Sequence, residues 1–220
     1  FQPESKDGFK KIVNVKKDKT PLTAPTKISE NLLWCFGAST GGTRALTEIL
    51  TSFPHQIPPT LIVQHIPPIF SRAFAESLNN LCPFTVKEAI HGEPILPNNV
   101  YIAPGGLQMG VDLKLGKLFI ALKDSAPVNR FKPSIDFLFN ELVRFDKLQI
   151  VAAVLTGMGK DGAEGLLKLK KSGAYTLAQN EQSSAVYGMP RHAYEIGAAH
   201  EVVDLSDIAP VFLGKSFNYR

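Results

Sequence analysis

The sequence predicts an α/β fold, in which a doubly wound, mainly parallel sheet is flanked by helices, with an antiparallel hairpin near 111–121. Runs dominated by apolar residues, such as LLWCF (32–36), TLIVQ (60–64) and IVAAVL (150–155), are typical of strands that are covered on both faces. Segments with apolar residues at helical spacing follow these runs, so strands and helices alternate along the chain. No apolar run approaches the ~18–20 residues that a bilayer span needs, and we therefore expect no membrane insertion.

Each element of this fold has its own pattern. Strands are expected at the apolar runs, which are 32–36, 60–64, 84–89, 99–104, 150–155, 174–179 and 200–205. Helices are expected where apolar residues recur every three or four positions, at 43–53, from near Ser71 to 81, at 133–143, 163–172 and 191–196. Pro133 opens the third of these helices at the favoured first-turn position, and Gly173 ends the fourth. The segment 111–121 alternates around Gly116, which predicts the hairpin.

Residues 1–30 differ from the rest of the chain, and we expect them to form a flexible linker or tail. They contain three Pro, seven Lys and four acidic residues, and at most one short strand at Ile12–Val15. Seven minus four gives this segment +3 of the formal net charge of +4, which leaves the expected catalytic domain, 31–220, nearly neutral. Because nucleic-acid-binding domains concentrate Lys and Arg on a folded face, we expect no nucleic-acid partner.

Three strands are followed by residues that a serine nucleophile requires. Ser39 lies in GASTGG (37–42) after the first strand, His65 follows the second, and Asp161 lies in TGMGKDG (156–162) after IVAAVL. In open α/β sheets, sites form beyond the carboxyl ends of the strands, so these side chains are expected to meet there. We predict that Ser39 is the nucleophile and His65 the general base. Asp161 is expected to accept a hydrogen bond from the imidazole Nδ1–H and so to fix its tautomer.

The same glycine-rich turns supply candidate contacts for an oxyanion or substrate, at Thr40, Met158 and Gly157. Each triad residue also has a purely structural interpretation. Ser39 and Asp161 have the side chains of helix N-caps, and His65 beside two prolines has the setting of a hydrogen-bonded loop residue. The pattern G-x-S-x-G is present around Ser39, but the order Ser, His, Asp is not that of α/β-hydrolases.

A nucleotide-binding α/β protein is an alternative hypothesis, because GASTGG follows a strand. However, this segment is not G-x-G-x-x-G, and the second strand ends in Gln64 and His65 instead of an acidic residue. No His, Cys and carboxylate set in the sequence has metal-ligand spacing, so we expect neither a metal nor an organic cofactor. The two cysteines, Cys35 and Cys82, are expected to be buried free thiols in a reducing compartment.

Six segments in the same order resemble the catalytic domain of the CheB protein-glutamate methylesterases of bacterial chemotaxis. They are GASTGG (37–42), QHIPPIFSRAFAESLN (64–79), YIAPG (101–105), PVNRFKPSIDFLF (127–139), AVLTGMGKDGAEGL (153–166) and AQNEQSSAVYGMPR (178–191). The resemblance implies the same nucleophile, base and carboxylate at Ser39, His65 and Asp161, and an oxyanion-side residue at Met158. It implies a cytoplasmic enzyme at receptor arrays that hydrolyses glutamyl methyl esters on chemoreceptors and deamidates certain receptor glutamines. A non-catalytic receptor-binding module on this fold is an alternative.

The sequence departs from the family pattern at three positions. Gln108 stands where the family usually has His, and Phe131 and Lys132 stand where it usually has His-Arg. If these positions contact the receptor, we expect an altered substrate preference. Family members also usually carry a phosphorylatable receiver domain before the esterase. Residues 1–30 are too few for a receiver and resemble the linker that follows one. Two alternatives follow: a receiver domain precedes this segment in the full-length protein and is a partner there, or the protein natively lacks a receiver and is controlled in another way.

Overall fold

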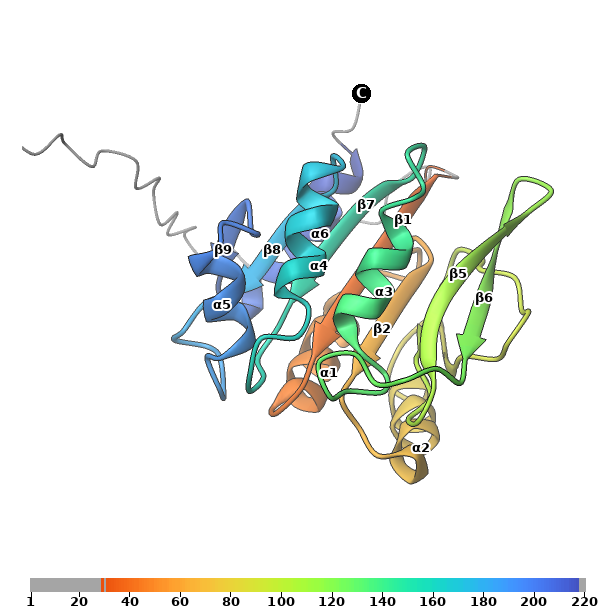
Figure 1. The fold of residues 1–220 in the computed structure, drawn as a ribbon, viewed down its shortest axis with the longest axis horizontal. Helices are drawn as coiled ribbons and strands as arrows, with labels where there is room; N and C mark the ends of the chain where they lie inside the picture. The colour runs from red at the N-terminus through yellow and green to blue at the C-terminus, as the bar shows by residue number, and fades with distance from the viewer. Residues whose placement is uncertain (1–28, 30, 218–220) are drawn as a thin grey trace, which may run out of the picture.

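The computed structural model describes residue 29 and residues 31–217, and the predicted strand at Ile12–Val15 lies outside the described residues. Seven parallel strands form one sheet in the order β3-β4-β2-β1-β7-β8-β9, and β5 and β6 form a separate antiparallel pair (Figure 1). The strands of the large sheet are β1 (Leu32–Ala38), β2 (Thr60–Gln64), β3 (Thr85–Glu88), β4 (Asn99–Ile102), β7 (Gln149–Val154), β8 (Tyr175–Gln179) and β9 (Glu201–Val203). The predicted α/β class is therefore confirmed. The hairpin, β5 (Gln108–Lys114) and β6 (Lys117–Lys123), is confirmed as well.

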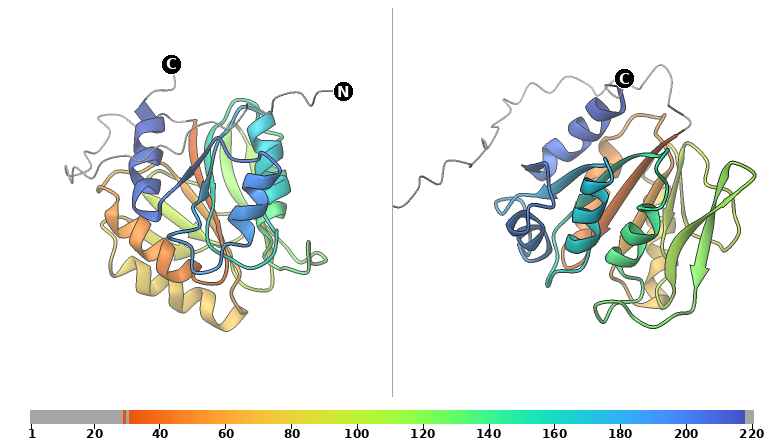
Figure 2. Two further views of the ribbon diagram at one scale, coloured as in Figure 1. Left: turned by 90° about the vertical axis from the view of Figure 1, so that its left-hand side faces the viewer. Right: turned by 45° about the horizontal axis from the view of Figure 1, so that its top comes forward.

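Helices cover both faces of the large sheet (Figure 2). They are α1 (Gly42–Ser52), α2 (Pro68–Asn79), α3 (Ile135–Leu142), α4 (Ala163–Lys171), α5 (Met189–Glu195) and α6 (Leu205–Phe217). Successive β1 side chains point to opposite faces, so Leu33 and Cys35 enter the core shared with α3, α4 and α5, whereas Trp34 and Phe36 enter the core shared with α1, α2 and α6. Burial on both faces explains why β1 is apolar throughout. No helix in the described ranges is long and apolar enough to cross a membrane.

Two helix starts and one whole helix stand out as differences from the expectation. Helix α2 begins at Pro68 instead of near Ser71, because a proline at the first helical turn needs no N–H partner. Helix α3 is capped by Ser134, whose Oγ accepts from Phe137 N, so Pro133 precedes the cap and does not open the helix. Helix α6 was not predicted at all, since Pro210 lies inside it.

The chain order of the strands places β1 at a switch point. From β1 the chain continues outward to β2 on one side, and it later returns to β7 on the other side of β1. Ala38 pairs with Gln64, and Gly37 pairs with Val154, so the carboxyl ends of β1, β2 and β7 lie side by side. Open α/β sheets bind ligands at such a switch point. The three predicted site residues therefore converge at one edge of the sheet.

Candidate active site

Ser39 sits on the turn between β1 and α1. Its backbone N–H donates to Thr156 O at 3.0 Å, and its carbonyl accepts from Gln64 Nε2 at 2.9 Å. The N-cap of α1 is Gly41, with φ of 79° and no side-chain cap, so the interpretation of Ser39 as a helix cap does not hold. Among the described residues, no hydrogen bond engages the Ser39 hydroxyl, and the residue is partly exposed. The backbone is thus fixed while the hydroxyl stays available.

Gly157 packs directly against Ser39. A Cβ at Gly157 would lie 2.6 Å from Ser39 Cβ, so only glycine permits this approach of the two loops. Its N–H donates to Val186 O at 3.0 Å and is therefore not available as an oxyanion donor. By contrast, no hydrogen bond within the described part of the chain occupies the N–H of Thr40 or of Met158. These two remain candidate donors.

His65 continues the pairing of β1 and β2, because its backbone N–H donates to Ala38 O at 3.0 Å. Its Nε2 lies 2.8 Å from Asp161 Oδ2, which corrects the expectation that Nδ1 faces the carboxylate. An ionised carboxylate can only accept, so Nε2 carries the proton of the neutral ring and Nδ1 carries the lone pair. That Nδ1 atom is buried and has no hydrogen-bond partner among the described residues. The ring therefore keeps its basic nitrogen free.

Asp161 is fully buried and well satisfied. Besides His65, its carboxylate accepts from Asn129 Nδ2 (2.9 Å), Ser134 Oγ (2.8 Å), Ile135 N (2.7 Å) and Asp136 N (3.3 Å). Burial acts to raise the pKa of Asp161, but the hydrogen bonds outweigh it and hold the pKa below its usual range. The N-cap of α4 is Gly162, so Asp161 does not serve as a helix cap. It faces the amino end of α3, whose dipole also favours the charged form.

Sequence reasoning missed two residues that support the site, Gln64 and Asn129. The Gln64 amide donates to the carbonyls of both Ser39 (2.9 Å) and His65 (3.0 Å), and so ties the turn after β1 to the end of β2. Asn129 donates to Asp161 and also to Asp136 Oδ2 at 2.6 Å. Burial raises the pKa of Asp136 above its usual value. A serine directly before a helix is typical of an N-cap and indicates Ser134, whereas no spacing rule indicates Gln64 or Asn129.

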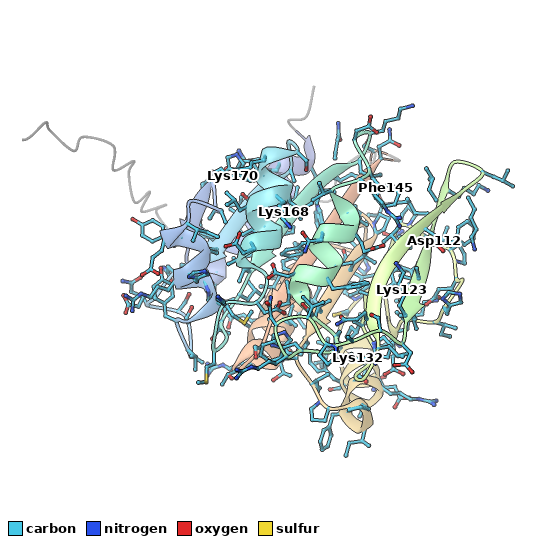
Figure 3. The ribbon with its side chains drawn as sticks, in the orientation of Figure 1. Asp112, Lys123, Lys132, Phe145, Lys168 and Lys170 are labelled. Atoms are coloured by element: carbon cyan, nitrogen blue, oxygen red, sulfur yellow. The ribbon has the colours of Figure 1, made fainter. Side chains whose placement is uncertain are left out.

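Gln108, Phe131 and Lys132 lie around this site. Phe131 stacks on the His65 ring, with centroids 3.7 Å apart and planes 8° apart. Gln108 is buried, donates to Phe131 O (3.0 Å) and accepts from Ser134 N (2.8 Å). Lys132 pairs with Asp124 in the segment before α3, near the carboxyl edge of the sheet (Figure 3). These side chains contact the base and its supporting segment.

A buried carboxylate–imidazole pair beside an accessible serine is the arrangement typical of serine hydrolases. The chain matches the CheB methylesterase family over residues 34–212 and belongs to that family. It is 44% identical over 200 residues to a protein named protein-glutamate methylesterase/protein-glutamine glutaminase from Chromohalobacter salexigens, covering 91% of this chain and 56% of the relative. A relative of the same name from Salmonella typhimurium is 45% identical over 201 residues, covering 89% of this chain and 58% of the relative. The chain thus spans little more than half the length of these relatives.

The fold is also similar to a solved structure of this family. The crystal structure of the Thermotoga maritima CheB methylesterase catalytic domain superposes with a TM-score of 0.80 at 36% sequence identity. The match covers 85% of this chain and 99% of that domain. The described residues therefore have the architecture of a CheB catalytic domain.

Proposed function

We propose that this chain is a chemoreceptor protein-glutamate methylesterase that hydrolyses γ-glutamyl methyl esters and deamidates receptor glutamines. The observation that carries the proposal is the buried hydrogen bond of 2.8 Å between His65 Nε2 and Asp161 Oδ2, one residue beyond the paired ends of β1 and β2. The other ring nitrogen, Nδ1, has no hydrogen-bond partner among the described residues, and the strand that ends before His65 pairs with the strand that ends before Ser39, which supports His65 as the base for Ser39. The relatives are named protein-glutamate methylesterase/protein-glutamine glutaminase, and these names support glutamyl methyl esters and glutamines of a protein as the substrates.

In the proposed first step, Ser39 Oγ attacks the ester carbonyl carbon and His65 Nδ1 takes the hydroxyl proton. The imidazolium formed is stabilised by Asp161, which stays ionised. The carbonyl oxygen becomes an oxyanion and accepts from the N–H groups of Thr40 and Met158, which lie after β1 and β7. Collapse of this intermediate breaks the bond to the methoxy oxygen, which leaves as methanol with the proton from His65.

The second step hydrolyses the acyl-enzyme. His65 Nδ1 removes a proton from water, the water oxygen attacks the acyl carbon, and the bond to Ser39 Oγ breaks. The proton returns to Ser39, and a glutamate side chain is released. A glutamine substrate follows the same course with ammonia as the leaving group. Apart from the attacking water, the groups that act on the substrate in both steps are side chains and backbone groups of the chain.

The proposal also covers the setting of the enzyme. The substrate partner is a methyl-accepting chemoreceptor in the cytoplasm, at receptor arrays. A receiver domain in the full-length protein, joined through residues 1–30, is part of the same proposal, and the linker-like composition of these residues supports it. The 31–220 unit is proposed to carry the catalytic function.

The test is methanol release from methylated chemoreceptor, compared between the wild-type chain and Ser39→Ala. We expect release by the wild type and a fall of at least about 10³-fold in the variant, because the nucleophile is lost. Equal release from both proteins would refute the serine mechanism. A wild-type chain that binds methylated receptor and never releases methanol would instead identify a non-catalytic receptor-binding module.

A further inference from the structure

The segment between β6 and α3 contains a tight two-residue turn at Val128–Phe131. The backbones of Val128 and Phe131 exchange two hydrogen bonds, at 3.1 and 2.8 Å. The two central residues, Asn129 and Arg130, have φ values of 53° and 72°. Positive φ at both central positions defines a type I′ turn, which is rare for arginine and therefore needs support from its surroundings.

The turn holds one face of the His65 ring. Phe131 lies parallel to the imidazole at a centroid separation of 3.7 Å, which is closer than the ~4.5–7 Å usual for aromatic pairs. The torsion that rotates a histidine ring is broad, so the side chain alone does not fix which way Nδ1 points. The hydrogen bond from Nε2 to Asp161 restrains the ring within its plane, and the phenyl face restrains it against tilting.

The turn also holds the carboxylate. Asn129 Nδ2 lies 2.9 Å from Asp161 Oδ1 and 2.6 Å from Asp136 Oδ2, so one amide group bridges two buried acids. The turn itself is anchored, because Gln108 donates to the Phe131 carbonyl. Asn129 and Phe131, which belong to one turn, thus contact both members of the His65–Asp161 pair.

We propose that the Val128–Phe131 turn positions the His65–Asp161 pair. Phe131 sets the plane of the His65 ring, and Asn129 sets the direction of the Asp161 carboxylate. This inference rests on the proposed function, since it concerns the same reaction.

Four variants test the positioning role. Phe131→Leu removes the stacked ring and Phe131→Tyr keeps it. Asn129→Gly removes the amide but retains a residue that favours positive φ. Arg130→Gly is the matched control, because it makes the same backbone change at an exposed position where the side chain has no hydrogen bond or ion pair among the described residues.

The activity readout is kcat and KM for methanol release from a receptor peptide that carries a glutamyl γ-methyl ester. We expect Phe131→Leu and Asn129→Gly to lower kcat by about 10- to 100-fold with KM changed by less than about 3-fold, since misorientation of a reacting group affects the chemical step. Phe131→Tyr and Arg130→Gly are expected to keep kcat within about 3-fold. Unchanged kcat in both Phe131→Leu and Asn129→Gly would overturn the proposal.

The spectroscopic readout does not depend on activity. NMR of the His65 ring protons, assigned with a His65→Gln variant, should show an upfield ring-current shift in the wild type and in Phe131→Tyr that disappears in Phe131→Leu. Ring protons that do not move in Phe131→Leu would overturn the stacking contact even if the wild type proved inactive. If the wild type releases no methanol while the shift is present, the proposed function fails and the contact stands. Should Phe131→Leu not fold, Asn129→Gly supplies the kinetic test.

Discussion

Replacing Gly157 with alanine is expected to displace Ser39, the proposed nucleophile, while leaving the protein folded. The new Cβ would lie 2.6 Å from Ser39 Cβ and 2.4 Å from Met189 Sδ, whereas carbon atoms ordinarily approach to about 3.5–4.0 Å. The Met189 sulfur belongs to a flexible side chain and can rotate. The Ser39 Cβ has no such freedom, because the N–H and carbonyl of Ser39 are both hydrogen-bonded. The contact is therefore relieved only if one of the two loops shifts by about 1 Å, which changes the position of Ser39 relative to the Gly157 loop. Gly157 does not have positive φ, and the backbone itself accepts alanine.

A displacement of about 1 Å predicts a fall of about 100-fold in kcat/KM, and overpacking predicts a loss of about 1–3 kcal/mol in the free energy of unfolding. Methanol release and thermal unfolding measure the two effects. Gly214→Ala is the control, since its Cβ would meet no heavy atom within 4 Å. A Gly157→Ala enzyme with wild-type kcat/KM and wild-type stability would refute the close approach of the two loops.

Four further predictions concern the residues around the site. Asp161→Asn should lower kcat by about 10⁴-fold, because the imidazolium loses its partner, and a fall under 10-fold would contradict this role. The pKa of Asp161 is lowered in the folded state, so below about pH 4 the unfolded chain binds more protons than the folded chain. The free energy of unfolding therefore decreases as the pH is lowered through this range. Acid denaturation of Asp161→Asn should show a weaker pH dependence, because this carboxylate is absent. Gln64→Met should cost about 1–3 kcal/mol of unfolding free energy, because two backbone carbonyls lose a donor, and an unchanged urea midpoint would contradict this. Arg130→Gly should raise stability by about 1 kcal/mol by relieving positive φ, as measured by thermal unfolding, and a lower melting temperature would argue against strain there.

The central sheet could be predicted because its strands are buried on both faces, and such strands are apolar at consecutive positions. The last helix could not be predicted in the same way. Pro210 argues locally against a helix, yet Ile208 and Phe212 are fully buried against the sheet and this packing stabilises α6. Tertiary burial therefore overrides the local signal at the end of the chain.

The predicted triad depends on the order of strands and helices along the chain, and this order can be predicted from the sequence. Residues that follow parallel strands are brought to one edge by the sheet itself, so Ser39, His65 and Asp161 could be selected without knowledge of any contact. The residues that orient them could not. Asn129 and Phe131 reach the site through a turn with two consecutive positive φ values, and Arg130 gives no sequence indication of that conformation.

The error over the imidazole nitrogen has a physical origin. The expectation of an Nδ1 contact came from a triad in which the histidine approaches its carboxylate in a different orientation. Here His65 is fixed by the end of β2, and Asp161 approaches from the loop before α4, so the carboxylate meets Nε2. Either nitrogen can act as the base, provided that the other donates to a buried carboxylate. The chemistry thus requires the pair and its orientation, and the contact of Asp161 with Nε2 leaves Nδ1 as the nitrogen that can act as the base.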